Sequence, residues 1–173
     1  MTTGGRHDGD GFTRMIDRHA GIVRKVAATY CREGDDRADL AQEILAQLWQ
    51  AWPRYDDARP FSTWMYRIAL NVAMSRMRDV YRGARHFVPL ADEHREIAGA
   101  AVDHEANQQL AMLDRVVAGL DELNRALLVL YLDDCSHREI AEILGLSESN
   151  VGTRIARLKQ RLRDQLTTQP TME

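Results

Sequence analysis

Apolar residues recur at helical spacing along almost the whole chain, and this pattern constrains the fold more than any other feature of the sequence. It runs through residues 12–30, 39–52 and 61–82, returns over 110–131, and appears again over 136–162. Between these stretches we find no alternating strand pattern of useful length, no internal repeat and no glycine-rich phosphate loop. The sequence therefore predicts an all-α fold.

Prolines and glycines mark where these helices must end. Gly34 breaks the first stretch, and Pro53 ends the second because the residue before a proline is pushed out of helical conformation. After Pro89, the segment 90–106 is rich in Ala, Asp, Glu and His and lacks a sustained apolar stripe, which is typical of a flexible linker. We therefore expect two small helical domains joined by a flexible linker. Their expected bounds are 12–89 for the first domain, 90–107 for the linker and 108–166 for the second domain.

Cysteines, histidines and apolar runs exclude several classes of protein. Cys31 and Cys135 lie far apart without a CxxC pattern, and the six histidines are scattered, so neither a disulfide framework nor a metal site is expected. The longest apolar run, 126–132, is too short to span a membrane, and the polar start 1–11 does not resemble a signal peptide. We expect a cytoplasmic protein without stable membrane association, cofactor, metal or catalytic residues.

The net charge of -3 hides an uneven distribution of charge along the chain. Residues 12–89 hold 13 basic and 9 acidic side chains, residues 90–134 hold 3 and 10, and residues 135–166 hold 6 and 4. Two basic blocks thus flank an acidic one. Since local clusters of basic groups decide binding to a polyanion, the average charge does not exclude nucleic acid as a partner.

The strongest local signal is a helix-turn-helix pattern that begins at Ser136. Ser136 and Glu139 have the spacing of a capping box, which satisfies exposed amides at a helix start. Ala141 is a small residue where two helices can cross closely, Gly145 suits a tight turn, and Val151 supplies a buried branched side chain. These spacings favour two helices joined by a sharp turn.

The second helix of this pattern combines an apolar stripe with basic residues. Ser147 is a second cap, and the stripe consists of Val151, Ile155, Leu158 and Leu162. The other faces carry Thr153, Arg154, Arg157, Lys159 and Arg161. These side chains either form an ordinary solvated face or bind the phosphates and base edges of DNA.

Over residues 12–166 the sequence resembles the extracytoplasmic-function sigma factors of bacterial RNA polymerase. Three blocks carry the resemblance in the family's order: DLAQE at 39–43 followed by Leu48-Trp49, FSTWMYRIALN at 61–71, and the segment 136–163 with Glu139-Ile140-Ala141 at its head. The resemblance implies that the first domain binds core polymerase and the minus-ten promoter element. It implies that the second domain reads the minus-thirty-five element.

The resemblance assigns candidate residues to each contact. Core polymerase is expected to bind Asp39, Leu40, Gln42 and Glu43, with Leu40 exposed among the polar groups. The minus-ten element is expected to contact Tyr55, Phe61, Arg67, Asn71, Arg76 and Arg78, whereas Trp64 is expected in the core. The minus-thirty-five element is expected to contact Ser149, Thr153, Arg154, Arg157, Lys159 and Arg161. Family members commonly carry a basic residue at the position of Gly152, so one contact is missing here.

The leading hypothesis is a sigma factor, not itself an enzyme, that directs promoter-specific initiation. Its expected partners are core RNA polymerase, promoter DNA and an anti-sigma factor, the last from family habit alone, and the free protein is expected to be a monomer. One alternative is a stand-alone helix-turn-helix regulator whose first domain senses a signal or dimerises. Another is a helical adaptor that sequesters an anti-sigma protein and no longer initiates transcription.

Overall fold

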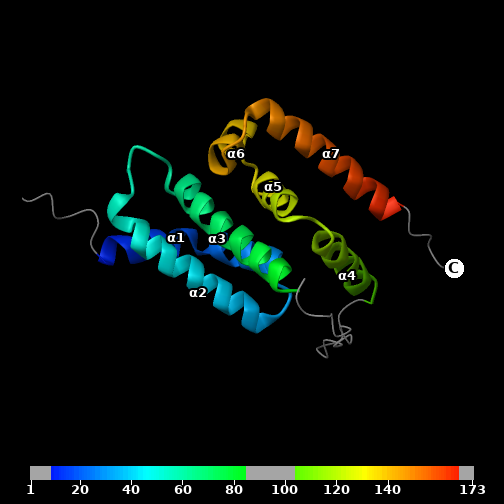
Figure 1. Ribbon diagram of the computed structural model, residues 1–173, viewed down its shortest axis with the longest axis horizontal. Helices are drawn as coiled ribbons and strands as arrows, with labels where there is room; N and C mark the ends of the chain where they lie inside the picture. The colour runs from blue at the N-terminus through cyan, green and yellow to red at the C-terminus, as the bar shows by residue number, and fades with distance from the viewer. Residues whose placement is uncertain (1–8, 85–103, 168–173) are drawn as a thin grey trace, which may run out of the picture.

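The computed structural model describes residues 9–84 and 104–167, and every regular element within these two ranges is helical (Figure 1). The all-α prediction is therefore confirmed for the described residues. The elements are α1 (Gly9–Tyr30), α2 (Gly34–Ala51), a short 3₁₀ helix (Trp52–Arg54), α3 (Phe61–Ala84), α4 (His104–Ala118), α5 (Glu122–Leu132), α6 (His137–Leu144) and α7 (Glu148–Thr167).

The first domain is formed by α1, α2 and α3, which all pack on one another. In α2, Leu40, Ile44 and Leu48 are spaced by four residues and are fully buried. Residues four apart lie on the same side of a helix, so these three form one stripe that faces the core. As the sequence predicts, α2 ends beside Pro53. The expected reason is wrong, however, because Trp52 keeps helical backbone angles (φ -52°, ψ -43°) and the chain continues as the 3₁₀ helix.

The second domain is built around α5. Every residue of this helix from Arg125 to Leu130 is buried. A helix that is buried all round must lie inside the molecule, and α5 indeed packs against α6 and α7 and also against α1 and α3. Asp121 caps its start by accepting a hydrogen bond from the Asn124 amide at 2.8 Å.

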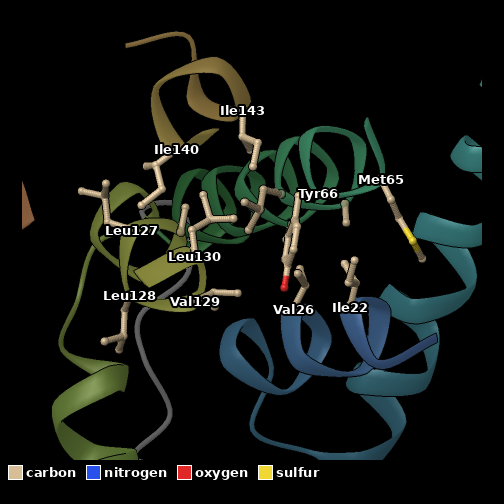
Figure 2. Close-up of a cluster of buried hydrophobic side chains, with 14 of the residues drawn as sticks. Ile22, Val26, Met65, Tyr66, Leu127, Leu128, Val129, Leu130, Ile140 and Ile143 are labelled. Carbon is tan, nitrogen blue, oxygen red and sulfur yellow. The ribbon is translucent and has the colours of Figure 1, made fainter. Parts of the chain in front are cut away.

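The two domains pack directly against each other through α5 and α6 on one side and α1 and α3 on the other (Figure 1). Figure 2 shows the apolar part of this junction, where Ile22, Val26 and Tyr66 lie near Leu130 and Ile143. All five side chains belong to one continuous cluster of buried residues. The sequence left the placement of the domains open, and the structure supplies it.

The expected linker, residues 90–107, falls largely outside the described residues. The helix α4 begins at His104, four residues before the expected start of the second domain at 108. Flexibility was expected for residues 90–106, and of these the residues 90–103 lie outside the described residues. Within the described ranges, no helix is long and apolar enough to cross a membrane.

Candidate polymerase and DNA interfaces

The helix-turn-helix is formed by α6 and α7, and its local chemistry matches the sequence pattern. The Ser136 hydroxyl accepts from the Glu139 amide at 3.2 Å, and the Glu139 carboxylate accepts from the Ser136 amide at 2.7 Å. The capping box is thus confirmed. Hydrogen bonds from the Ser136 hydroxyl and amide lower the pKa of Glu139 below its ordinary value of 4.5. The two reciprocal hydrogen bonds satisfy exposed amides at the start of α6.

The turn between α6 and α7 also follows the prediction. Gly145 has φ of +68°, in the left-handed region that glycine enters without steric cost. After it, the Ser147 hydroxyl accepts from the Asn150 amide at 3.2 Å and caps the start of α7. Ala141 and Val151 are buried where the two helices meet. These contacts orient the amino-terminal half of α7 relative to α6.

The outward side of α7 carries only some of the expected DNA-contacting residues. Ser149, Thr153 and Arg157 are exposed, and Arg154 is half-buried with its Nε donating to Asn150 Oδ1 at 2.7 Å. Lys159 instead lies over the ring of Tyr131 in α5, with Nζ 4.2 Å from the ring centroid. Arg161 is exposed and donates to the Gly119 carbonyl at 3.1 Å. The last two cations therefore turn toward their own domain in this structure.

Gly152 lies on the side of α7 that meets α6. A Cβ at this position would lie 3.5 Å from His137 Nδ1 and 3.6 Å from His137 Cε1, which is ordinary contact. A longer basic side chain would share its space with the imidazole. The missing basic residue at 152 thus coincides with a histidine ring packed over the site.

An aromatic cluster joins the 3₁₀ helix to the start of α3. Tyr55 stacks on Trp52 with ring centroids 5.5 Å apart, and Phe61 and Trp64 contact Tyr55 at 5.4 and 5.0 Å. Phe61 is only 5% exposed, so the expectation that it offers a stacking surface to a base is wrong for this structure. Trp64 is half-buried, and Tyr55 is half-buried with its hydroxyl donating to the Arg59 carbonyl at 2.9 Å.

The exposed side of α3 carries Arg67, Asn71 and Arg78. Successive residues of a helix are rotated by about 100°, so these three positions fall on one side and position 76 falls on the opposite side. Arg76 is accordingly half-buried against α2, where it pairs with Asp36 at 3.3 Å and Glu43 at 3.7 Å. Arg76 therefore links two helices of the first domain and does not share the surface of the other three.

The same helical geometry divides the DLAQE segment of α2. Asp39, Gln42 and Glu43 are exposed, whereas Leu40 is fully buried. The expectation of an exposed Leu40 is wrong, because this residue continues the core stripe that includes Ile44 and Leu48. The candidate polymerase surface on α2 is consequently polar.

Two residues that matter at the domain junction escaped the sequence analysis. Arg125 is buried within the apolar helix α5, and Asp133 follows its end. Arg125 is the only charged residue in the stretch 123–132, and a charge within such a run signals an internal polar contact. The sequence signal was thus present for Arg125. Among the described residues, no group of His, Cys, Asp and Glu has the arrangement of a metal site.

Comparison with known families and proteins bears directly on both domains. The family descriptions "Sigma-70 region 2" and "Sigma-70, region 4" match residues 15–96 and 110–162, respectively. The RNA polymerase sigma factor CnrH of Cupriavidus metallidurans is 30% identical over 164 residues, which cover 87% of this chain and 84% of CnrH. The ECF RNA polymerase sigma factor SigW of Bacillus subtilis is 29% identical over 169 residues, with 92% and 90% of the two chains covered.

Two solved structures resemble the fold over nearly the whole chain. CnrH in complex with the cytosolic domain of CnrY has a TM-score of 0.68 and 26% identity, and the match covers 94% of this chain and 92% of CnrH. The sigma factor RpoE in complex with the anti-sigma factor NepR from Bartonella quintana has a TM-score of 0.71 at 20% identity, over 92% and 98% of the two chains.

The chain belongs to the sigma-70 family of RNA polymerase sigma factors. Within that family it is an extracytoplasmic-function sigma factor, which confirms the resemblance seen in the sequence. It directs promoter-specific initiation by binding core polymerase and promoter DNA. Because both domains match sigma regions, the alternative of a stand-alone regulator is not supported.

Proposed function

We propose that three separate polar surfaces of this sigma factor divide the work of initiation. One lies on α2 and binds core polymerase, one lies on α3 and contacts the minus-ten element, and one lies on α7 and reads the minus-thirty-five element. The observation that carries this proposal is the division of each helix into a buried apolar side and an exposed polar side. The boundary between the two domains lies between α3 and α4.

The polymerase surface of α2 consists of Asp39, Gln42 and Glu43. Their exposed carboxylates and amide suit a basic partner surface, because complementary charge steers association and fixes the register of an interface. Leu40 supports this surface from beneath by anchoring α2 in the core. Glu43 is also positioned by Arg76, which approaches it to 3.7 Å.

The minus-ten surface of α3 consists of Arg67, Asn71 and Arg78. Guanidinium groups bind phosphates, and an amide can contact phosphate or base edges. Tyr55 directly follows the 3₁₀ helix that precedes α3 and belongs to the aromatic cluster, and we assign its half-exposed ring to stacking on an unpaired base. Phe61 acts from beneath by holding Tyr55 and Trp64, and Arg76 acts by joining α3 to α2.

The minus-thirty-five surface of α7 consists of Ser149, Thr153, Arg154 and Arg157. The second helix of a helix-turn-helix enters the major groove with its amino-terminal residues at the base edges. Arg154 is the candidate base reader, while Arg157 is the candidate phosphate contact one turn later. Lys159 and Arg161 join this surface if they leave Tyr131 and the Gly119 carbonyl on binding DNA.

The remaining partner is an anti-sigma factor. Support comes from two relatives, since CnrH is solved with the cytosolic domain of CnrY and RpoE is solved with the anti-sigma factor NepR. The polymerase partner supplies the phosphodiester chemistry, so this chain needs no catalytic group of its own. The cytoplasm is the compartment that holds polymerase and promoter DNA. The free protein acts as a monomer.

The polymerase surface is tested by replacing Asp39→Asn together with Gln42→Ala. This pair leaves the contact between Glu43 and Arg76 in place, and both side chains are exposed, so the helix should stay folded. We expect about tenfold weaker binding to core polymerase in a pull-down titration, with unchanged circular dichroism. Asp17→Asn, which changes one exposed carboxylate on α1, is the matched control. Equal affinity of the double variant and wild type would remove α2 from the interface.

A further inference from the structure

Asn150 is an exposed polar residue in the first turn of α7, three positions after the cap residue Ser147. The Ser147 hydroxyl accepts from the backbone amide of Asn150 at 3.2 Å, so the cap fixes the backbone at this position. In a helix-turn-helix, the amino-terminal residues of the second helix meet the base edges in the major groove. Asn150 therefore stands at the depth along α7 where bases are read.

The position of Asn150 around α7 also places it on the proposed minus-thirty-five surface. At about 100° per residue, position 150 falls between the positions of Arg157 and Arg154 on the helix. The buried stripe that contains Val151 and Ile155 begins beyond Arg154, which is half-buried. Asn150 thus lies on the exposed side of Arg154.

A hydrogen bond joins Asn150 to Arg154, one helical turn later. Arg154 Nε donates to Asn150 Oδ1 at 2.7 Å, which is the length of a charge-assisted hydrogen bond. Because a guanidinium has donors only, the amide group must turn its oxygen toward Arg154 and its NH₂ group away from it. The bond uses Nε, so the two Nη groups of Arg154 keep the fork that pairs with a base.

The outer side of this pair consists of hydrogen-bond donors, namely the Nη groups of Arg154 and Nδ2 of Asn150. In the major groove, guanine presents two acceptors, O6 and N7, whereas cytosine presents only the N4 donor. A fork of donors fits the guanine edge and finds no partner on cytosine. The chemistry of the pair therefore favours a guanine opposite Arg154.

Other cations of α7 are held in a different way. Lys159 lies over an aromatic ring of α5, and Arg161 donates to a backbone carbonyl that follows α4. Both of these partners draw the cation toward the body of its own domain. The partner of Arg154 is instead an exposed residue of the same helix, so the guanidinium is held on the outward surface.

Holding an arginine in advance strengthens its recognition of a base. A long side chain loses rotamer freedom when it binds, and this loss weakens binding by about two- to tenfold for each side chain that becomes ordered. The bond to Asn150 restricts Arg154 before DNA is present. Less freedom is then lost on contact with the matching base.

We propose that Asn150 is a positioning residue for promoter recognition, which holds the Arg154 guanidinium toward a guanine of the minus-thirty-five element. This inference rests on the proposed function, in which Arg154 reads a base of that element. Asn150 acts through its oxygen, so the position requires an acceptor rather than an amide. Without that acceptor Arg154 adopts other directions, and the protein discriminates less well between bases while its fold is unchanged.

The test selects promoters from a library randomised over the minus-thirty-five element, using full-length variants bound to core polymerase. Asn150→Ala removes the acceptor. Asn150→Asp keeps an oxygen in the same place for Arg154 Nε and removes the NH₂ donor. Arg154→Ala identifies the position of the promoter that this arginine reads.

Gln160→Ala is the matched control. Its exposed amide also bonds to a side chain four positions later, with Nε2 donating to Asp164 Oδ1 at 2.8 Å, but it lies in the carboxy-terminal half of α7. Circular dichroism checks that the variants keep the helical content of wild type. Because Asn150 and Gln160 are both exposed, no loss of folding is expected from either substitution.

We expect Arg154→Ala to abolish a guanine preference at one position and Asn150→Ala to reduce the preference at that same position by about two- to tenfold. Asn150→Asp and Gln160→Ala should retain it. The added carboxylate of Asn150→Asp repels phosphates and weakens binding to all sequences alike, which leaves the relative preference unchanged.

Two results would overturn the positioning role of Asn150. One is a wild-type preference at that position in Asn150→Ala, and the other is an Asn150→Asp protein that loses the preference as Asn150→Ala does. An unchanged preference in Arg154→Ala would instead count against the proposed function, because Arg154 would then not be a base reader and the positioning role would fall with it.

Discussion

The domain junction and the outward side of α7 both carry arginines, yet they use them in opposite ways. At the junction, Arg125 is 7% exposed and donates to four backbone carbonyls. On α7, Arg157 is exposed on a helix whose opposite side packs on α5 and α6. A buried, fully engaged guanidinium holds the protein together, whereas an exposed one on a recognition helix is available to a ligand. Burial and the number of partners, rather than residue type, separate the structural Arg125 from Arg157, which we propose as a DNA contact.

The largest effect is expected where this comparison predicts a structural role. Arg125→Ala leaves carbonyls of α1 and α4 without their donor inside the protein, so we expect a loss of about 3 kcal/mol in the free energy of unfolding. Urea denaturation measures this loss. Arg157→Ala is the control, with an expected change within about 0.5 kcal/mol. Similar losses for both variants would mean that burial does not separate the two arginines.

The next effect concerns recognition of DNA rather than folding. Arg154→Ala should weaken binding to the cognate promoter by about 1 to 3 kcal/mol and relax the preference at one position of the minus-thirty-five element. Arg157→Ala should weaken binding to all DNA sequences alike. It should also reduce the slope of log affinity against log salt concentration by about one unit. Holoenzyme binding to a promoter library at several salt concentrations separates the two classes. An unchanged sequence preference for Arg154→Ala would mean that Arg154 contacts phosphates and does not read a base.

A smaller effect sharpens the account of how the helix-turn-helix is oriented. Ser136→Ala removes the cap of α6 and should cost about 1 kcal/mol of stability near neutral pH. The pKa of Glu139 is lowered in the folded protein, so its contribution is present above the ordinary value of 4.5 and disappears as pH falls through the folded pKa. The difference between variant and wild type should therefore shrink in acid. A difference that stays constant from pH 7 to pH 3, measured by thermal unfolding, would contradict this explanation.

The last prediction, of similar size, concerns two glycines that differ in backbone conformation. Gly152→Ala should stabilise the protein by up to about 1 kcal/mol, because α7 gains helix propensity and the new Cβ makes ordinary contact with His137. Gly145→Ala should destabilise by about 1 kcal/mol, because φ of +68° is strained for any side chain. In thermal unfolding, Gly152→Ala should therefore raise the midpoint temperature relative to wild type, and Gly145→Ala should lower it. A loss of stability for Gly152→Ala would mean that the imidazole cannot accommodate the methyl group.

The features predicted correctly from the sequence are local ones. The capping box at Ser136, the turn at Gly145 and the end of α2 beside Pro53 each depend on residues within a few positions of one another. Their geometry follows from backbone chemistry alone, so a single sequence is enough. The family resemblance then extends these local features to a function for the whole chain.

The wrong predictions concern which side of a helix a residue faces, and the missed contact joins residues far apart in the chain. Leu40 was expected on the surface beside Asp39, but neighbouring residues lie about 100° apart around a helix and only Asp39 faces outward. Arg76 was grouped with Arg67, although it faces α2. The pairing of Arg125 with the end of α1 joins residues far apart in the chain, and no local pattern specifies such a contact.

We propose that two surfaces on separate domains of this sigma factor read separate promoter elements once core polymerase is bound. Promoter-library selection with core polymerase and wild type, Arg67→Ala or Arg154→Ala tests it most directly. We predict that enrichment requires core polymerase and that Arg154→Ala alters the sequence preference only in the minus-thirty-five element. Arg67→Ala should lower transcript output or alter the sequence preference in the minus-ten element, and it should leave the minus-thirty-five preference unchanged. Enrichment without core polymerase, or the same change from both variants, would contradict it.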